Sequence, residues 1–182
     1  MAARQIQPGT LLDAADRFLT AAPGGPDAAS DRRAVSTAYY ALFHAITGRV
    51  ASAIIPTADE VVRGRVRRWI GHGSIRAVAV WVAQLHGGRT GSPPPHIVAL
   101  RRSGAPSPLV GPDTVEIAEG FIEMNEARHL ADYDHEAVIS REDARGHLDL
   151  ARSVVALVER ASSPEAACFF GLIALQARIQ GR

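Results

Sequence analysis

The chain's candidate functional centre is the eight-residue segment from Arg128 to His135, which reads RHLADYDH. An arginine presents a planar fork of N–H donors suited to phosphate or carboxylate. A histidine titrates near neutral pH and can therefore take up or release a proton. Arg128, His129, Asp132 and His135 thus place an anion-binding group, two proton carriers and a carboxylate within two helical turns.

The spacing of this segment places charge where a core residue is expected. One stripe at helical spacing contains Ile117, Phe121, Met124, Arg128, Ala131 and His135. Because burying an unpaired arginine is very costly, Arg128 must either pair with Asp132 one turn later or face a cleft or a partner. A structural pair at this i,i+4 spacing, with two surface histidines, is the competing interpretation.

The elements that must position this segment are helical almost throughout. Apolar periodicity and helix-breaking residues predict helices over about 9–22, 27–54, 59–86 and 113–133, one that starts at Ser140 and one opened by Ser163-Pro164. Gly71-His72-Gly73 can kink or split the third helix. Ser140 and Asp143 form a variant of the capping box. The last helix is apolar on several sides, which is typical of a central helix or a subunit contact.

The length and bulk composition predict one globular domain over residues 1–182, and the helical patterns make it all-α. Apolar residues make up 47% of the 182, and the net charge of +1 gives no global steering toward nucleic acid. The Gly/Pro-rich stretch 87–112 is a lid, an insertion or a disordered loop. The single cysteine, Cys168, excludes an internal disulfide and reads as core filler. No signal peptide or apolar membrane span is expected, which favours a cytoplasmic protein that does not associate with membranes.

Two segments resemble the HEPN superfamily. Residues 33–45, RAVSTAYYALFHA, look like the family's second helix, and residues 128–135 look like its signature of an arginine, a polar residue and a histidine. The ADYD sequence at 131–134 is similar to one bacterial branch of that family. Here six residues separate Arg128 from His135, the upper end of the family's spacing. The resemblance implies an up-and-down bundle of five to six helices.

The resemblance also implies an activity. It predicts a metal-independent endoribonuclease without cofactors, a bacterial toxin or defence effector, in which Arg128, His129 and His135 are catalytic and Asp132 and Tyr133 support them. A homodimer would bring two such motifs together. The RNA 2′-hydroxyl would attack the adjacent phosphate and leave a 2′,3′-cyclic phosphate. An antitoxin of the nucleotidyltransferase type is the implied partner.

Other interpretations remain open on the sequence alone. A non-catalytic HEPN module would bind RNA, a nucleotide or a protein, and a plain helical scaffold would bind no ligand. A basic run that includes Arg63, Arg67 and Arg68 can track an RNA backbone, although a solvated helix face is commoner because Glu60 lies close by. No metal site is expected, since His129, Asp132 and His135 converge poorly on a helix. Three aromatic residues of the second helix are expected in the core: Tyr39, Tyr40 and Phe43.

Overall fold

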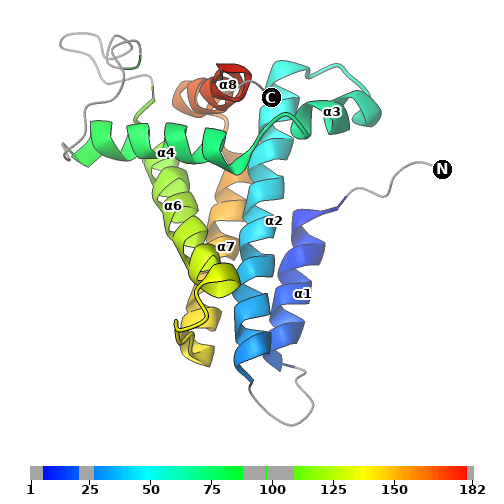
Figure 1. Ribbon diagram of the computed structural model, residues 1–182. Helices are drawn as coiled ribbons and strands as arrows, with labels where there is room; N and C mark the ends of the chain where they lie inside the picture. The colour runs from blue at the N-terminus through cyan, green and yellow to red at the C-terminus, as the bar shows by residue number, and fades with distance from the viewer. Residues whose placement is uncertain (1–5, 21–26, 88–96, 98–108, 180–182) are drawn as a thin grey trace. The chain divides into compact units, whose positions relative to one another are not determined.

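The computed structural model describes residues 6–20, 27–87, 97 and 109–179. Its helices are α1 (Pro8–Thr20), α2 (Ala28–Ile54), α3 (Glu60–Arg67), α4 (His72–Gly87), α6 (Pro112–Tyr133), α7 (Arg141–Arg160) and α8 (Pro164–Ile179) (Figure 1). The described residues contain no strand, so the all-α class expected from the sequence is confirmed. Most of the 87–112 stretch lies outside the described residues. The expectation of a lid, an insertion or a disordered loop there falls on those residues.

The chain divides into two compact units. Unit 1 contains residues 1–45 and 123–156, and unit 2 contains residues 46–122 and 157–182. Unit 1 therefore holds α1, the first part of α2, the end of α6 and most of α7. Unit 2 holds α3, α4, α8 and the remaining parts of the three long helices. The whole candidate segment 128–135 belongs to unit 1, and the single domain over 1–182 stays a prediction.

Unit 1 is built on apolar side chains from all four of its helical segments. Its buried apolar residues are Ala15, Leu19, Ala34, Val35, Ala38, Tyr39, Ala41, Leu42, Ala45, Met124, Ala127, Ala131, Ala144, Leu148, Ala151, Val154 and Val155. An ion pair of 2.7 Å between Arg145 Nη1 and Asp16 Oδ1 joins α7 to α1. Many of these core residues are alanine, which brings helix backbones close together and makes long-range contacts of the larger side chains possible.

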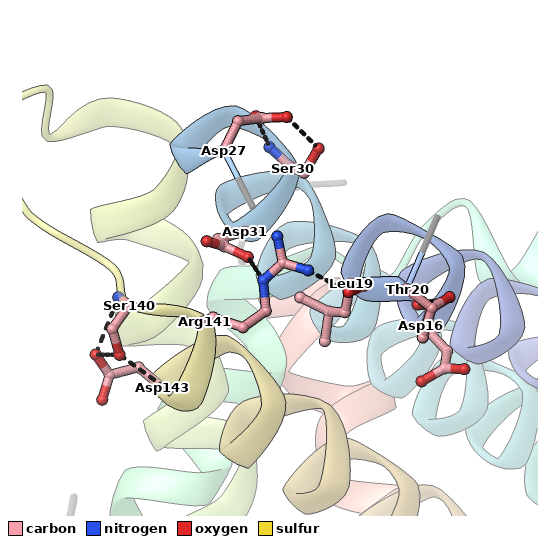
Figure 2. A network of polar contacts seen from close by, with 9 residues as sticks. All are labelled: Asp16, Leu19, Thr20, Asp27, Ser30, Asp31, Ser140, Arg141 and Asp143. Atoms are coloured by element: carbon pink, nitrogen blue, oxygen red, sulfur yellow. Dashed lines mark hydrogen bonds and ion pairs between the residues drawn. The ribbon is translucent and has the colours of Figure 1, made fainter. Parts of the chain in front are cut away.

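Two helices of unit 1 begin at side-chain caps, which Figure 2 shows. Asp27 precedes α2 and accepts hydrogen bonds from the Ser30 backbone N–H at 2.7 Å and from the Ser30 hydroxyl at 2.9 Å. At the start of α7, Ser140 Oγ accepts from the Asp143 N–H at 3.0 Å, while Asp143 Oδ2 accepts from the Ser140 N–H at 3.1 Å. This reciprocal pair is the capping box that the sequence predicts.

Unit 2 packs α4 against α8. Its buried apolar side chains include Ile75, Val78, Val82, Ile117, Phe121, Phe169, Phe170 and Ile173. The last helix is apolar on several sides, as expected, but the structure buries only part of that surface: Leu175 is 61% and Ile179 is 70% exposed. The Ser163 hydroxyl accepts from the Ala166 N–H at 3.2 Å and caps this helix.

The helix expected over 59–86 is split into α3 and α4. At the break, Trp69 N–H donates to Val66 at 3.0 Å and Ile70 N–H to Arg67 at 3.2 Å, both to the third residue back. This tighter pattern ends an α-helix. The break, just before Gly71, brings the number of helices in the described residues to seven, where five to six were expected. No helix among them has the length and apolar character needed to cross a membrane.

Candidate functional site

The end of α6 is held by an arginine from α2. Arg32 Nε donates to the Ala131 carbonyl at 2.9 Å, and Nη1 donates to the Ala137 carbonyl at 2.8 Å. Its Nη2 donates to Leu130 at 2.9 Å and also to Asp134. The last carbonyls of a helix have no partner within the helix, so one guanidinium here satisfies several of them at once. Arg32 therefore fixes both the place where α6 ends and the segment that follows it.

The segment after α6 is also ordered by its own side chain. Asp134 Oδ1 accepts hydrogen bonds from the Glu136 N–H at 3.0 Å and from the Ala137 N–H at 3.1 Å. An aspartate that bonds to backbone amides two and three residues later is typical of a turn that follows a helix. Because α6 ends at Tyr133, His135 lies in this turn and is not part of the helical stripe that the sequence suggests.

Arg128 is the centre of a polar and aromatic cluster in unit 1. Its Nε forms an ion pair with Asp132 Oδ2 at 2.6 Å, and the Arg128 side chain is only 13% exposed. Its Nη2 donates to the hydroxyls of Tyr133 at 2.9 Å and of Tyr40 at 3.3 Å. The guanidinium carbon lies 4.9 Å from the ring centre of Tyr133, 5.8 Å from that of Tyr40 and 5.9 Å from that of Tyr39. Arg128 is therefore paired with Asp132, which is one of the alternatives that the sequence leaves open.

The surroundings of Arg128 keep it charged. Burial by itself pulls the pKa of the guanidinium down, but the hydrogen bond to Tyr40 and the electrostatic interactions with Tyr40, Asp132 and Tyr133 outweigh it and raise the pKa above its ordinary value. Two of its three polar partners are tyrosine hydroxyls. Such neutral acceptors compete with an incoming anion less strongly than a second carboxylate would.

Tyr39 lies beneath this cluster as a neutral hydroxyl. Its side chain is fully buried, and the Asn125 amide donates to its hydroxyl oxygen at 3.1 Å. Burial raises the pKa of Tyr39 to about 12, although the Asn125 hydrogen bond and the Arg128 charge act in the opposite direction. Tyr39 is thus a packing residue that supports the cluster and carries no charge at neutral pH.

The two histidines of the segment are placed differently. Both are exposed. The His129 ring lies 5.3 Å from the Tyr133 ring, at an angle of 49°. His135 makes no hydrogen bond or ion pair with the described part of the chain and lies two residues beyond the end of α6. The structure therefore brings Arg128, His129, Asp132 and Tyr133 into one cluster, with His135 adjacent in sequence and outside its contacts.

The sequence does not predict the contacts that two residues of this arrangement make. Tyr40 was expected in the core; it is half-buried, and its hydroxyl meets Arg128 across a separation of 88 residues. Arg32 meets the end of α6 across about 100 residues. Neither contact follows from local spacing, because helix periodicity assigns a side chain to a face and not to a partner. Phe43 is likewise half-buried, and Tyr39 alone of the three aromatic residues is fully buried.

The basic run belongs to unit 2 and is partly neutralised. Arg67 Nη1 lies 2.6 Å and Arg63 Nε 3.5 Å from Glu60 carboxylate oxygens, while Arg68 is exposed. These pairs fit a solvated helix face, which is the commoner of the two interpretations of this basic run.

Three other observations on the described residues point to no second site. No group of three or more histidine, cysteine, aspartate or glutamate side chains among them is arranged to hold a metal ion. Cys168 is half-buried, and burial raises the pKa of its thiol, which makes it a poor nucleophile at neutral pH. A surface hollow of unit 2 near His86 and Glu116 contains none of the expected site residues.

Comparisons of the chain with models of protein families, with curated proteins and with solved structures found no match. The likeness to HEPN proteins therefore rests on the two sequence segments, 33–45 and 128–135. Both of these segments contribute to the cluster around Arg128: Tyr39 and Tyr40 come from the first, and Asp132 and Tyr133 from the second.

Proposed function

We propose that this chain is a metal-independent endoribonuclease of the HEPN type and acts as a bacterial toxin or defence effector. The observation that carries the proposal is the state of Arg128. It is held in a defined position by Asp132 and two tyrosine hydroxyls, and its Nη1 donates no hydrogen bond to the described part of the chain. Exposed histidines follow it directly at 129 and two residues past the helix end at 135.

The reaction we propose is attack by an RNA 2′-hydroxyl on the adjacent phosphate. His135 takes the proton of that hydroxyl while the O2′–P bond forms and the P–O5′ bond breaks. The departing 5′-oxygen receives a proton from an imidazolium, for which His129 is the nearer candidate to Arg128. The products are a 2′,3′-cyclic phosphate and a 5′-hydroxyl. No redox step occurs, and the protons balance between the two histidines.

Arg128 has the electrostatic part in this reaction. Its Nη1, which donates no hydrogen bond to a described residue, donates to a phosphate oxygen and offsets the charge that grows there in the transition state. Asp132 and Tyr133 support Arg128 by fixing its guanidinium plane, and Tyr40 does the same from α2. A pre-positioned charge is worth more than a mobile one because little reorganisation accompanies the reaction.

A homodimer is part of the proposal. One chain supplies a single Arg128 to the phosphate, and a two-fold axis would bring in a second motif. Exposed apolar side chains around the segment support such a contact: Leu130 is 47% and Val138 is 91% exposed. The other partner we propose is an antitoxin of the nucleotidyltransferase type, in the cytoplasm.

The test is RNA cleavage by the purified chain in the presence of EDTA. We expect cleavage of a structured RNA with unpaired loops and fragments that carry a 2′,3′-cyclic phosphate. Cleavage should fall at least about 100-fold in His135→Ala. The matched control is His86→Ala, since His86 is also exposed but belongs to unit 2. Equal loss in both variants, or fragments with a 3′-hydroxyl, would contradict the mechanism.

One observation favours the alternative, a HEPN-like module that binds without cutting. Because His135 makes no hydrogen bond or ion pair with a described residue, no polar contact within those residues holds its imidazole in a fixed orientation. A general base that is not held in place contributes little. Binding of RNA, a nucleotide or a partner protein that depends on Arg128, with no cleavage in any buffer, would support this alternative.

A further inference from the structure

Tyr133 is a large aromatic side chain that is held in place and yet mostly exposed. Its exposed fraction is 60%, although its phenol ring is partly apolar. The Arg128 Nη2 donates to its hydroxyl at 2.9 Å, and the Arg128 guanidinium carbon lies 4.9 Å from its ring centre. Most exposed tyrosines lose orientation in water. This one is fixed by Arg128 while much of its surface remains accessible to a ligand.

Two further contacts help to position the Tyr133 ring, one through the backbone of its own helix and one with a neighbouring ring. Tyr133 is the last residue of α6, and Arg32 binds the carbonyls of Leu130 and Ala131 in that same helical turn. The His129 ring lies 5.3 Å away at an angle of 49°, so the two exposed rings form a tilted pair. We name this pair the aromatic platform; it consists of His129 and Tyr133.

The aromatic platform lies next to a cation that can hold a phosphate. In a nucleotide, the base and the phosphate are one sugar apart. A flat ring beside a guanidinium therefore matches the two ends of a single nucleotide. Bases expose their faces to a protein ring only where they are unpaired and unstacked, since a duplex buries those faces. Stacking on an aromatic side chain tolerates any base, because every base has a π-face.

We propose that the aromatic platform stacks an unpaired nucleobase of the RNA, next to the phosphate held by Arg128. This inference rests on the proposed function and adds the residues that would give it a preference for single-stranded segments and loops, with little preference among bases. Tyr133 is then a binding residue that selects single strands, and its ring, not its hydroxyl, makes the selection.

The experiment measures binding of a fluorescently labelled 2′-O-methyl RNA, which the proposed chemistry cannot cleave because its nucleophile is blocked. The same sequence is used as a single strand and as a perfect duplex. We expect the single strand to bind more tightly than the duplex. Tyr133→Leu should weaken single-strand binding about 5- to 150-fold, the range that the loss of one stacked base gives. Tyr133→Phe, which keeps the ring, should stay within about threefold of the wild-type chain.

The matched control is Trp69→Leu. Trp69 is 58% exposed, as accessible as Tyr133, but it belongs to unit 2. It should leave single-strand binding unchanged. Circular dichroism melting of each variant checks that the helices are intact. Tyr133→Leu binding like the wild-type chain, or a duplex bound as tightly as the single strand, overturns the inference. So does a change of oligomeric state in Tyr133→Leu with RNA binding intact, because that result assigns the ring to a subunit contact.

The outcome of this binding experiment can be distinguished from the outcome of the cleavage experiment that tests the proposed function. Ring-dependent binding of the single strand without cleavage of ordinary RNA supports the platform and refutes the ribonuclease. Cleavage that survives Tyr133→Leu with unchanged KM supports the ribonuclease and refutes the platform. A rise in KM in Tyr133→Leu that Tyr133→Phe reverses supports both, and a fall in kcat shared by the two variants reflects loss of the hydroxyl that supports Arg128.

Discussion

Arg128 and Arg141 both belong to unit 1, and each meets an aspartate, but the two surroundings differ. Arg141 Nε lies 2.5 Å from Asp31 Oδ1, and its Nη1 donates to the Leu19 carbonyl, so that it joins α7 to the first turn of α2 and to α1 (Figure 2). The Asp31 side chain is 7% exposed. Arg128 pairs with Asp132 on its own helix, and that carboxylate is 25% exposed.

The difference separates a structural charge from a candidate functional one. The partners of Arg141 come from distant segments and are buried, so the arginine holds three helices together. The partners of Arg128 are one carboxylate and two hydroxyls that are half-buried or exposed, and its Nη1 donates no hydrogen bond to the described part of the chain. Loss of the first should therefore affect folding, and loss of the second should affect chemistry and leave the fold largely intact.

The largest effect should come from Arg128→Gln, which keeps part of the side-chain stem and removes the charge. We expect cleavage to fall about 100- to 1000-fold, the range seen when one transition-state donor is lost. The free energy of unfolding should fall by only about 1 kcal/mol, since Asp132 can turn to water. Kinetics on a loop-containing RNA and urea unfolding of the same preparation measure both.

Arg145→Gln is the matched control for that variant. Arg145 also pairs with one aspartate, Asp16, but its side chain is 42% exposed and the pair lies between α7 and α1. It should leave cleavage unchanged. If Arg128→Gln lost most of its stability and its activity only in proportion, Arg128 would be a structural residue like Arg141.

The next effect should be the destabilisation caused by Arg141→Met. Removing one partner leaves a buried Asp31 carboxylate without its cation, which costs about 3–5 kcal/mol in buried pairs. We expect about 3 kcal/mol, at the low end, because Arg141 itself is 28% exposed. Urea unfolding followed by circular dichroism gives the value.

The double variant Asp31→Asn/Arg141→Met tests the cause of that loss. It removes the stranded charge, so it should recover a large part of the stability that the single variant loses. A double variant no more stable than Arg141→Met would show that the Leu19 hydrogen bond and packing, rather than the buried carboxylate, account for the effect.

We expect a smaller effect from Arg32→Ala. Arg32 has a structural role at the end of α6 and also holds the turn next to the candidate site. Its loss leaves the Ala131 carbonyl without the donor that Arg32 supplies, while the Leu130 carbonyl keeps the Asp134 N–H at 3.3 Å, so we expect a cost of about 1–3 kcal/mol. The turn that carries His135 should loosen as well. We therefore expect kcat to fall and KM to stay near its wild-type value, measured under conditions where the variant is fully folded. Unchanged kcat in a folded Arg32→Ala chain would separate the helix cap from the reaction.

Local features of the sequence predict most of the helices and almost none of the contacts between them. The start of α7 follows from Ser140 and Asp143, three residues apart, because a capping box is made within one turn. The pair of Arg128 and Asp132 follows from i,i+4 spacing in the same way. The roles of Tyr40 and Arg32 do not, since each depends on which helices pack together. The split before Gly71 is predicted in part. The glycines indicate that the helix can break there, but the break itself is made by the tight turn at Trp69 and Ile70.

The smallest effect concerns pH and the cap of the helix that starts with Arg141. The Ser140 hydroxyl and backbone N–H lower the pKa of Asp143 below its ordinary value of 3.8. A carboxyl whose pKa is lowered on folding adds stability above pH 3.8 and loses it as the pH falls through the lower, folded value. Asp143→Asn should therefore be less stable than the wild-type chain at pH 6, and the difference should shrink below pH 4.

Urea unfolding of both chains at pH 6, 4 and 3 measures this difference, with Ser140→Ala as a second variant that removes the hydroxyl contact. In that background Asp143→Asn should have a smaller effect at pH 6. Asp143 is exposed, so its whole contribution should stay below that of the buried Asp31. The pH-dependent loss of stability could instead be as large as the loss in Arg141→Met. Unit 1 would then depend on carboxylates at the start of α7 and not on the buried pair of Arg141 and Asp31. That outcome would remove the contrast between a structural Arg141 and a functional Arg128.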